Sequence, residues 1–114
     1  MAYRGPMPDT EAMTTSSTTP TYDRLLTTIE EMKARRGDRP MHPAESALRK
    51  IHSKAITAGQ RAGECAVRNI FKPYEYEPFG SYDHAELSRK AQDAARVASA
   101  RARERHVVKA GVLA

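Results

Sequence analysis

This chain of 114 residues has few of the large apolar side chains from which hydrophobic cores are built. It has no tryptophan, and leucine, isoleucine, valine and phenylalanine together number only 16, whereas 18 residues are alanines. Burial of so little apolar area offsets only part of the ordering cost, which is about 1 to 2 kcal/mol per residue. We therefore expect a chain with little core of its own that completes its fold against a larger partner.

Cysteine is almost absent, since Cys65 is the only one. A single thiol forms no internal disulfide, on which small secreted domains usually rely, so we expect a cytoplasmic or cytoskeletal protein that is not secreted. The sequence also lacks a run of about 18 apolar residues and an apolar signal segment near its beginning, so we expect no membrane insertion. Cys65 stands at the margin of an alanine stripe and is predicted to be buried.

The residue types that catalysis or metal binding requires do not gather in this sequence. Four histidines are scattered along it, and none stands at metal-ligand spacing with a cysteine or a carboxylate. They are His42, His52, His84 and His106. Gly59 and Gly63 lie within a helical pattern and do not follow a strand, which excludes a phosphate-binding loop. We predict a protein that is not an enzyme, with no metal, no cofactor and no small-molecule substrate.

The net charge of +5 comes from the later part of the chain. Residues 1–43 hold six Lys or Arg and six Asp or Glu, whereas residues 44–114 hold 13 against 8. A basic region indicates an acidic partner. The eight carboxylates of the same region would be repelled by phosphates, so an acidic protein surface is favoured over nucleic acid.

The pattern along the chain predicts an all-α fold with an extended N-terminal arm, one short helix and two long ones. Residues 1–19, rich in Ser, Thr and Pro, are predicted as the arm. An amphipathic helix is predicted over 20–37, with Thr19 as its cap, Pro20 in its first turn and Gly37 at its end. Its apolar face consists of Tyr22, Leu25, Leu26, Ile29 and Met32.

A second helix is predicted from Pro43 to about Ile70, with His42 as its cap. Its narrow stripe of mostly small residues consists of Ala44, Leu48, Ile51, Ala55, Ala58, Gly59, Ala62 and Ala66. Because glycine destabilises a helix by about 1 kcal/mol relative to alanine, Gly59 and Gly63 indicate the close approach of another backbone. A cationic row about 33 Å long runs beside the stripe and is predicted to bind the partner. It consists of Lys50, Lys54, Arg61, Arg68 and Lys72.

Residues 71–82 interrupt the helical pattern with two prolines, a glycine and five of the seven aromatic residues. The five are Phe71, Tyr74, Tyr76, Phe79 and Tyr82. Aromatic rings contribute much of the binding energy at protein interfaces, so we predict that this loop anchors the partner. A loop that folds back to cover the helix ends is the alternative. Glu75 and Glu77 disfavour stacking on nucleic-acid bases.

A third helix is predicted after Asp83, which precedes Glu86 at the spacing of a capping box, and it ends near Lys109. Its small-residue stripe consists of Leu87, Ala91, Ala94, Ala95, Ala98 and Ala102. Arg89, Arg96 and Arg103 recur every seven residues on the opposite side and are predicted to bind the partner. Residues 38–114 thus form a hairpin-like region in which the two alanine-rich helices pack either on each other or separately on the partner.

These features favour a structural or stabilising subunit of a large acidic protein assembly. A filament is the most specific partner suggested, in particular a tubulin lattice such as that of a flagellar axoneme. Two alternatives stay open. One is a peripheral RNA-binding protein of a ribosome or another ribonucleoprotein, which an excess of 13 Arg over 6 Lys supports. The other is a self-associating helical bundle.

Overall fold

The computed structural model describes residues 18–111, and the regular elements in this range are all helical. Helix α2 spans Pro20–Arg36, α3 spans Pro43–Phe71 and α4 spans His84–Ala110. Two short 3-10 turns, η1 (Lys72–Tyr74) and η2 (Phe79–Ser81), lie between α3 and α4. The predicted all-α class is confirmed, whereas the predicted arm falls almost wholly outside the described residues.

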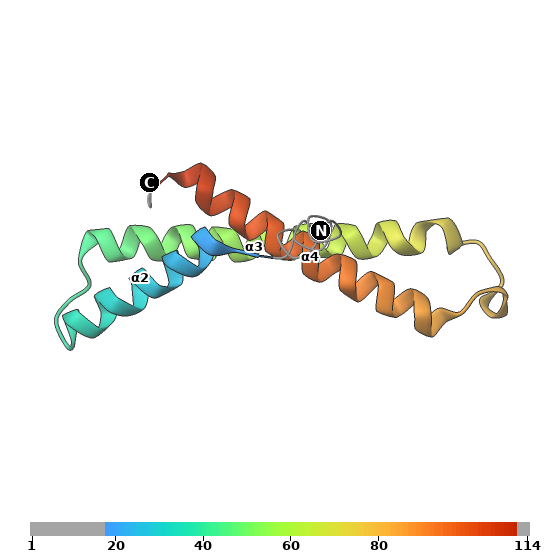
Figure 1. Ribbon diagram of the computed structural model, residues 1–114, viewed down its shortest axis with the longest axis horizontal. Coiled ribbons are helices and arrows are strands. Elements are labelled where there is room, and N and C mark those ends of the chain that lie inside the picture. Colours follow the sequence, from blue (N-terminus) through green and yellow to red (C-terminus); the bar gives the residue numbers. More distant parts are fainter. Residues whose placement is uncertain (1–17, 112–114) are drawn as a thin grey trace, which may run out of the picture.

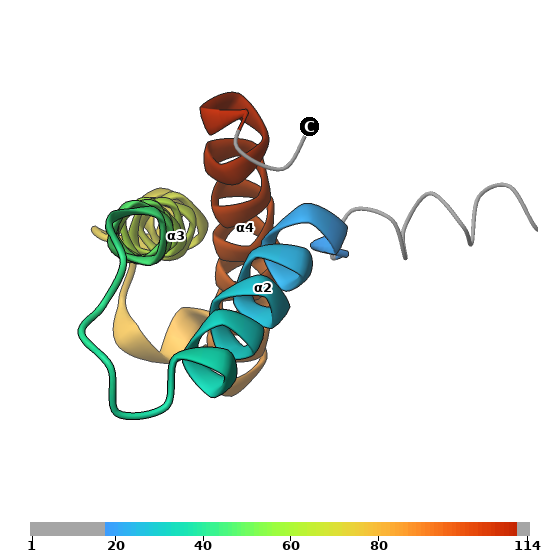
Figure 2. The same cartoon turned by 90° about the vertical axis from the view of Figure 1, so that its left-hand side faces the viewer.

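The two long helices form a hairpin in which α4 crosses α3 near the middle of both (Figure 1). Helix α2 runs beside the first half of α3, and the view along α3 shows α2 and α4 on the same side of it (Figure 2). The alanine-rich helices therefore pack on each other, which is one of the two arrangements that the sequence left open.

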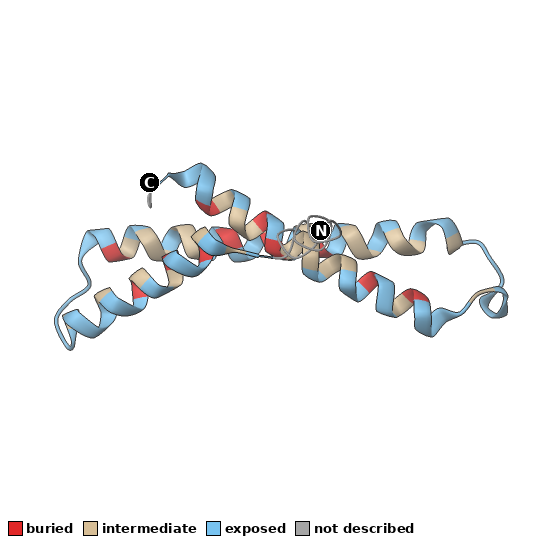
Figure 3. Cartoon of the chain, in the orientation of Figure 1, coloured by how far each residue is buried: buried red, intermediate tan, exposed pale blue. Residues whose placement is uncertain are grey.

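The buried core lies where all three helices meet. Its members are Tyr22, Leu25, Ile29, Ala55 and Val107, with Leu26, Leu48 and Ile51 packed against them. Figure 3 shows the buried positions on the sides of the helices that face one another. Most of the large side chains of this core come from α2, so the hairpin and α2 depend on each other for apolar contact.

At the helix starts, side chains accept hydrogen bonds from backbone amides that have no partner within the helix, as the sequence predicts. The Ala44 amide donates to Nδ1 of His42 at 3.0 Å, and the Glu86 amide donates to Oδ1 of Asp83 at 3.2 Å. Gly37 and Gly111 adopt positive φ angles of 60° and 69° after α2 and α4. These positions favour glycine because other residues rarely adopt positive φ.

The first turn of α2 is capped by a distant residue and not by Thr19. The Thr19 hydroxyl donates to Oδ1 of Asp23, so it does not accept from the helix amides. Instead Oε1 of Glu104, in α4, accepts from the amides of Thr21 at 3.0 Å and of Tyr22 at 2.9 Å. A carboxylate is favourable at this position because helix N-termini carry partial positive charge. Glu104 thereby fastens the start of α2 to α4.

Gly59 marks the closest approach of α3 and α4. A Cβ atom added to Gly59 would lie 2.8 Å from Oγ of Ser99, 2.9 Å from Cγ of Arg103 and 3.1 Å from the Ser99 carbonyl oxygen. A Cβ atom added to Gly63 would lie 3.5 Å from the Ala95 carbonyl oxygen, which is ordinary contact. The close backbone predicted from the two glycines is therefore α4, and of the two positions only Gly59 is so close that a Cβ atom would force its neighbours to shift.

The buried faces differ from the predicted stripes at three places. Ala44 is exposed, because it lies at the start of α3 beyond the crossing. Ala100 and Val107 are buried although they lie outside the stripe predicted for α4. The second half of α4 contacts α2 as well as α3, so its buried face is wider than a single stripe.

The prediction that Cys65 is buried is wrong, since the residue is exposed. Six positions separate it from Gly59, and at 100° per residue this turns it away from α4. The margin of the alanine stripe therefore lies outside the contact with α4, although the nearby Gly63 is buried in it.

Gly59→Ala is expected to lower the free energy of unfolding by about 1 kcal/mol. Overpacking against Ser99 and Arg103 costs about 2 kcal/mol, and the higher helix propensity of alanine returns about 1 kcal/mol. Gly63→Ala is the matched control and is expected to raise the free energy of unfolding by up to about 1 kcal/mol, because propensity acts there without overpacking. Urea unfolding followed by circular dichroism measures both. Equal effects of the two substitutions would contradict a crossing centred on Gly59.

Candidate partner-binding surfaces

The cationic row forms a continuous basic face on α3. All five side chains are exposed, and none has an ion pair within residues 18–111. They are Lys50, Lys54, Arg61, Arg68 and Lys72. At 100° per residue from Gly59 they lie between about 180° and 220°, directly opposite α4. The row borders the alanine stripe, as predicted, but the stripe packs on α4, so a single contact with a partner does not use both.

The three arginines predicted on the outer side of α4 have different environments. Arg89 and Arg96 are exposed, and Nη2 of Arg96 pairs with Oδ1 of Asp93 at 3.0 Å. Both partners of this pair are about two-thirds exposed, with relative accessibilities of 70% and 67%, so the pair contributes little stability.

Arg103 is half-buried against Tyr22 of α2, so the expectation that it faces outward is wrong. Its Nη1 donates to Oγ of Ser99 at 2.6 Å, and its guanidinium lies over the Tyr22 ring, 5.1 Å from the centroid. Its Nε is buried and has no hydrogen-bond partner among the described residues. The heptad spacing missed this because Arg103 lies one turn after Ser99, where α2 covers α4. Arg103 therefore joins α2 to the crossing.

Tyr22 contributes a second polar contact to the same region. Its hydroxyl lies 3.2 Å from Nε2 of His52, and the two rings are 5.7 Å apart. This contact explains His52 structurally, as a polar residue that packs on α2 from α3.

The aromatic residues between α3 and α4 gather at the tip of the hairpin. The Tyr74 and Tyr82 ring centroids are 5.0 Å apart, and those of Phe79 and Tyr82 are 6.5 Å apart. His84 joins them at 5.5 Å from Phe79 and 5.7 Å from Phe71. The predicted loop thus folds partly on itself, and His84, which the sequence placed only near a helix start, belongs to the cluster.

Two of the aromatic rings remain in solvent. Tyr76 is 92% exposed and Phe79 is 74% exposed, whereas Phe71, Tyr74 and Tyr82 are half-buried. Aromatic side chains are enriched in protein interfaces, where their large area is buried on binding. Of the five residues predicted as an anchor, Tyr76 and Phe79 are therefore available for contact, and the other three support them.

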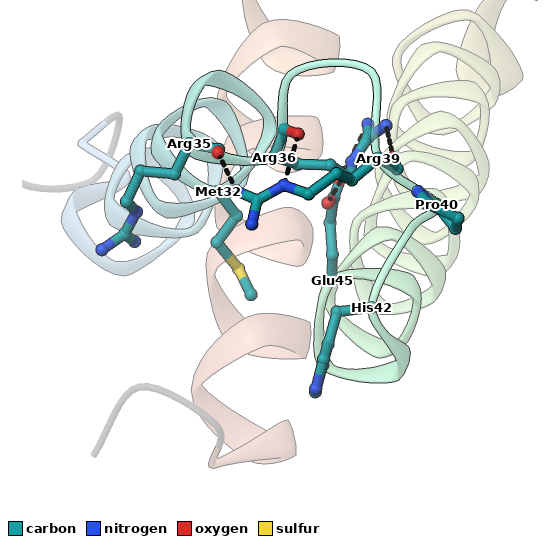
Figure 4. Close-up of a pocket in the computed structure, with 7 residues that line it drawn as sticks. All are labelled: Met32, Arg35, Arg36, Arg39, Pro40, His42 and Glu45. Atoms are coloured by element: carbon teal, nitrogen blue, oxygen red, sulfur yellow. Dashed lines mark hydrogen bonds and ion pairs between the residues drawn. The ribbon is translucent and has the colours of Figure 1, made fainter.

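A pocket of about 320 Å³ lies between the end of α2 and the start of α3 (Figure 4). Its lining consists of Met32, Arg35, Arg36, Arg39, Pro40, His42 and Glu45. The Arg39 guanidinium donates to the carbonyl oxygens of Arg35 and Arg36 at the end of α2, and the Arg36 carbonyl also accepts from the Arg39 amide. Most of the positive charge around the pocket is thereby engaged within the chain.

Glu45 is the buried charge at this pocket, with 1% of its surface exposed. Its Oε1 accepts from Nε of Arg36 at 2.9 Å, and its Oε2 accepts from Nε of Arg49 at 3.0 Å. The hydrogen bond from Arg36, followed by that from Arg49, holds the pKa of Glu45 below its usual range. The same bond raises the pKa of Arg36. These ion pairs thus have a structural role, since they join α2 to α3. We call Glu45 with Arg36 and Arg49 the Glu45 clasp.

The sequence did not reveal the roles of Glu45 and Glu104. Both are ordinary acidic residues on helices, and their partners come from other helices. An acidic residue in the first turn of α3 was a weak signal for Glu45, but only the packing of α2 shows that it is buried.

Residues 18–111 contain no group of three or more metal-ligating side chains and no helix long and apolar enough to cross a bilayer. Comparison of the chain with protein-family models, curated proteins and solved structures finds no match. Among the described residues, the basic face of α3 and the exposed rings of Tyr76 and Phe79 are the surfaces that suit contact with a partner.

The Glu45 clasp is expected to make the free energy of unfolding depend on pH in the acid range. Because folding lowers the pKa of this carboxyl group, its contribution is complete above its unfolded pKa and is lost as pH falls through the lower folded value. Glu45→Gln should lower Tm at pH 7, and the Tm difference from the unsubstituted chain should vanish progressively as pH falls below the ordinary pKa of glutamate and through the lower folded value. Thermal unfolding followed by circular dichroism provides the measurement.

Asp93→Asn is the matched control, because Asp93 pairs with Arg96 in solvent. This substitution should change Tm little at any pH. A Tm difference for Glu45→Gln that stays constant from neutral to acid pH would show that the ionised carboxylate is not what stabilises the clasp.

Proposed function

We propose that this chain is a non-enzymatic structural subunit that docks through the basic face of α3 onto a large acidic protein assembly. The observation that carries the proposal is the row of five exposed cations without ion pairs, opposite the face that packs on α4. Docking on this face would not disturb the hairpin, since no residue of the row takes part in its contacts. Glu64 borders the row, and its carboxylate favours a partner of moderate negative charge over dense phosphate.

The length of the row supports an extended partner. A row of about 33 Å is several times the Debye length of about 8 Å at physiological salt. Each cation therefore attracts mainly the charge directly opposite it, and a partner must present acidic groups along the whole row. A filament surface meets this requirement, whereas a small acidic ligand does not. A tubulin lattice, including that of a flagellar axoneme, is the assembly of this kind that we propose.

Charge reversal on the basic face tests the proposal. Lys54→Glu, Arg61→Glu and Arg68→Glu together are expected to weaken co-sedimentation with stabilised microtubules by about tenfold or more, because repulsion replaces attraction along the row. The matched control reverses three exposed cations elsewhere, with Arg24→Glu, Lys33→Glu and Lys90→Glu, and should change binding by less than about threefold. Equal losses for the two variants would show that only net charge matters.

RNA binding is the outcome that would contradict an acidic protein partner. The same three proteins are titrated with single-stranded RNA at several salt concentrations. Tighter binding to RNA than to microtubules, with affinity falling by orders of magnitude as salt rises, would favour a ribonucleoprotein instead.

Cys65 supplies an independent measurement of contact. It is the only cysteine of the chain and is exposed between Arg61 and Arg68. A photo-crosslinker attached to this thiol should join the chain covalently to the microtubule surface. Crosslinking from Cys65 that fails while co-sedimentation persists would place the contact elsewhere on the molecule.

A further inference from the structure

The tip of the hairpin is acidic, although the chain as a whole is basic. Residues 73–88 contain four carboxylates and no lysine or arginine, in a chain of net charge +5. The carboxylates belong to Glu75, Glu77, Asp83 and Glu86, all exposed. None has an ion pair within the described part of the chain. The acidic tip, meaning residues 73–88, therefore combines negative charge with the exposed rings of Tyr76 and Phe79.

Local contacts hold the acidic tip in shape without a partner. The Glu77 amide donates to the Tyr74 carbonyl at 3.1 Å, and the Ser81 amide donates to the Pro78 carbonyl at 3.0 Å. Ring contacts of Tyr82 with Tyr74 and Phe79 join the two turns. A surface that is already ordered loses little entropy on binding, so its exposed rings are prepared for contact.

A surface that complements this tip needs cations beside an exposed apolar side chain. Cations attract both carboxylates and the faces of aromatic rings. Outside the tip, the large exposed apolar residues in the described range are Met41, Ile56 and Val108, and Val108 is the most exposed at 56%. Arg105 and Lys109 stand three positions before and one position after Val108, both exposed and without an ion pair in that range. We call these three residues the α4 tail.

Met41 and Ile56 are less suitable than Val108 as the apolar side chain of a surface that binds the acidic tip. Met41 is 44% exposed, and the neighbouring Arg39 guanidinium is engaged with the end of α2. Ile56 is 36% exposed and lies about 120° around α3 from Lys50 and Arg68. The α4 tail is thus the surface on which cations and apolar area coincide.

The acidic tip and the α4 tail of one molecule do not meet. His84 and Val108 are at opposite ends of the same helix, 24 residues and about 36 Å apart. The tip of one copy reaches only the tail of another.

We propose that the acidic tip of one copy binds the α4 tail of a second copy. The two surfaces differ, so the copy that uses its tip keeps a free tail and the second copy keeps a free tip, and the contact repeats head to tail into open chains. The basic face of α3 is not used, so this contact does not depend on the function proposed above. Tyr76 and Phe79 pack against Val108, and the carboxylates of Glu75 and Glu77 face Arg105 and Lys109.

Sedimentation of the full chain alone tests the proposal. At about 50 mM salt, where charges are weakly screened, the protein should form a series of species that grows with concentration and recedes as salt is added. A tip variant carries Tyr76→Ser and Phe79→Ser, and a tail variant carries Arg105→Glu and Val108→Ser. Each is expected to associate at least about tenfold more weakly than the unsubstituted chain. All four positions are exposed, and unchanged circular dichroism spectra and Tm values establish that both variants fold.

Mixing the two variants is the decisive step. The tip variant keeps its tail and the tail variant keeps its tip, so the mixture should give one-to-one dimers and nothing larger. If either variant fails to fold, Glu75→Gln with Glu77→Gln replaces the tip variant and Arg105→Gln replaces the tail variant. Restored dimers support the proposal, because a symmetric contact would not be restored in this way.

Three results overturn the proposal. The first is an unsubstituted chain that stays monomeric at every concentration. The second is a mixture of folded variants that forms no dimer. The third is association that Lys54→Glu, Arg61→Glu and Arg68→Glu abolish, because the tip would then sit on the basic face of α3. If that last variant still associates, the result supports the α4 tail as the surface that binds the acidic tip.

Discussion

The contact of α3 and α4 at Gly59 is the constraint from which the rest of this structure follows. Ser99 and Arg103 lie so close that even a Cβ atom at Gly59 would force them to shift. At this contact the small-residue faces of α3 and α4 pack on each other, so neither face is available to a partner. What α3 presents to solvent is then the opposite side, with its row of cations. The crossing also leaves the connection between the helices far from the core, at the end of the molecule (Figure 1).

Helix α2 is held by polar contacts as much as by apolar ones. Only three of its residues, Tyr22, Leu25 and Ile29, are buried. Its start is held by Glu104 from α4 and its end by Glu45 from α3. Buried ionic contacts of this kind add little net stability, but the loss of one partner leaves a costly unpaired charge. They therefore define where α2 lies more than they stabilise it, which is consistent with a chain poor in large apolar side chains.

The sequence predicted what depends on neighbouring residues. The helix bounds, the caps at His42 and Asp83 and the terminal glycines follow from local patterns, and the structure confirms them. The sequence could not predict contacts between distant positions, such as that of Glu104 with an amide 83 residues away. The same limit explains Arg103 and Cys65. A helical wheel shows which residues share a face but not which face packs on a neighbouring helix, and α4 packs on the Gly59 side of α3, about 120° around the helix from Cys65.

The aromatic tip is larger than the hairpin requires. Helices that pack side by side are usually joined by about 2 to 8 residues, whereas the connection from Lys72 to Asp83 has 12. Tyr74 and Tyr82 explain how the connection is ordered, and Phe79 adds ring contacts with Tyr82 and His84. Even so, most of the Phe79 ring and nearly all of the Tyr76 ring are in solvent. The stability of one molecule therefore accounts for the supporting rings but not for the exposed ones, whose apolar area is useful only where another surface covers it.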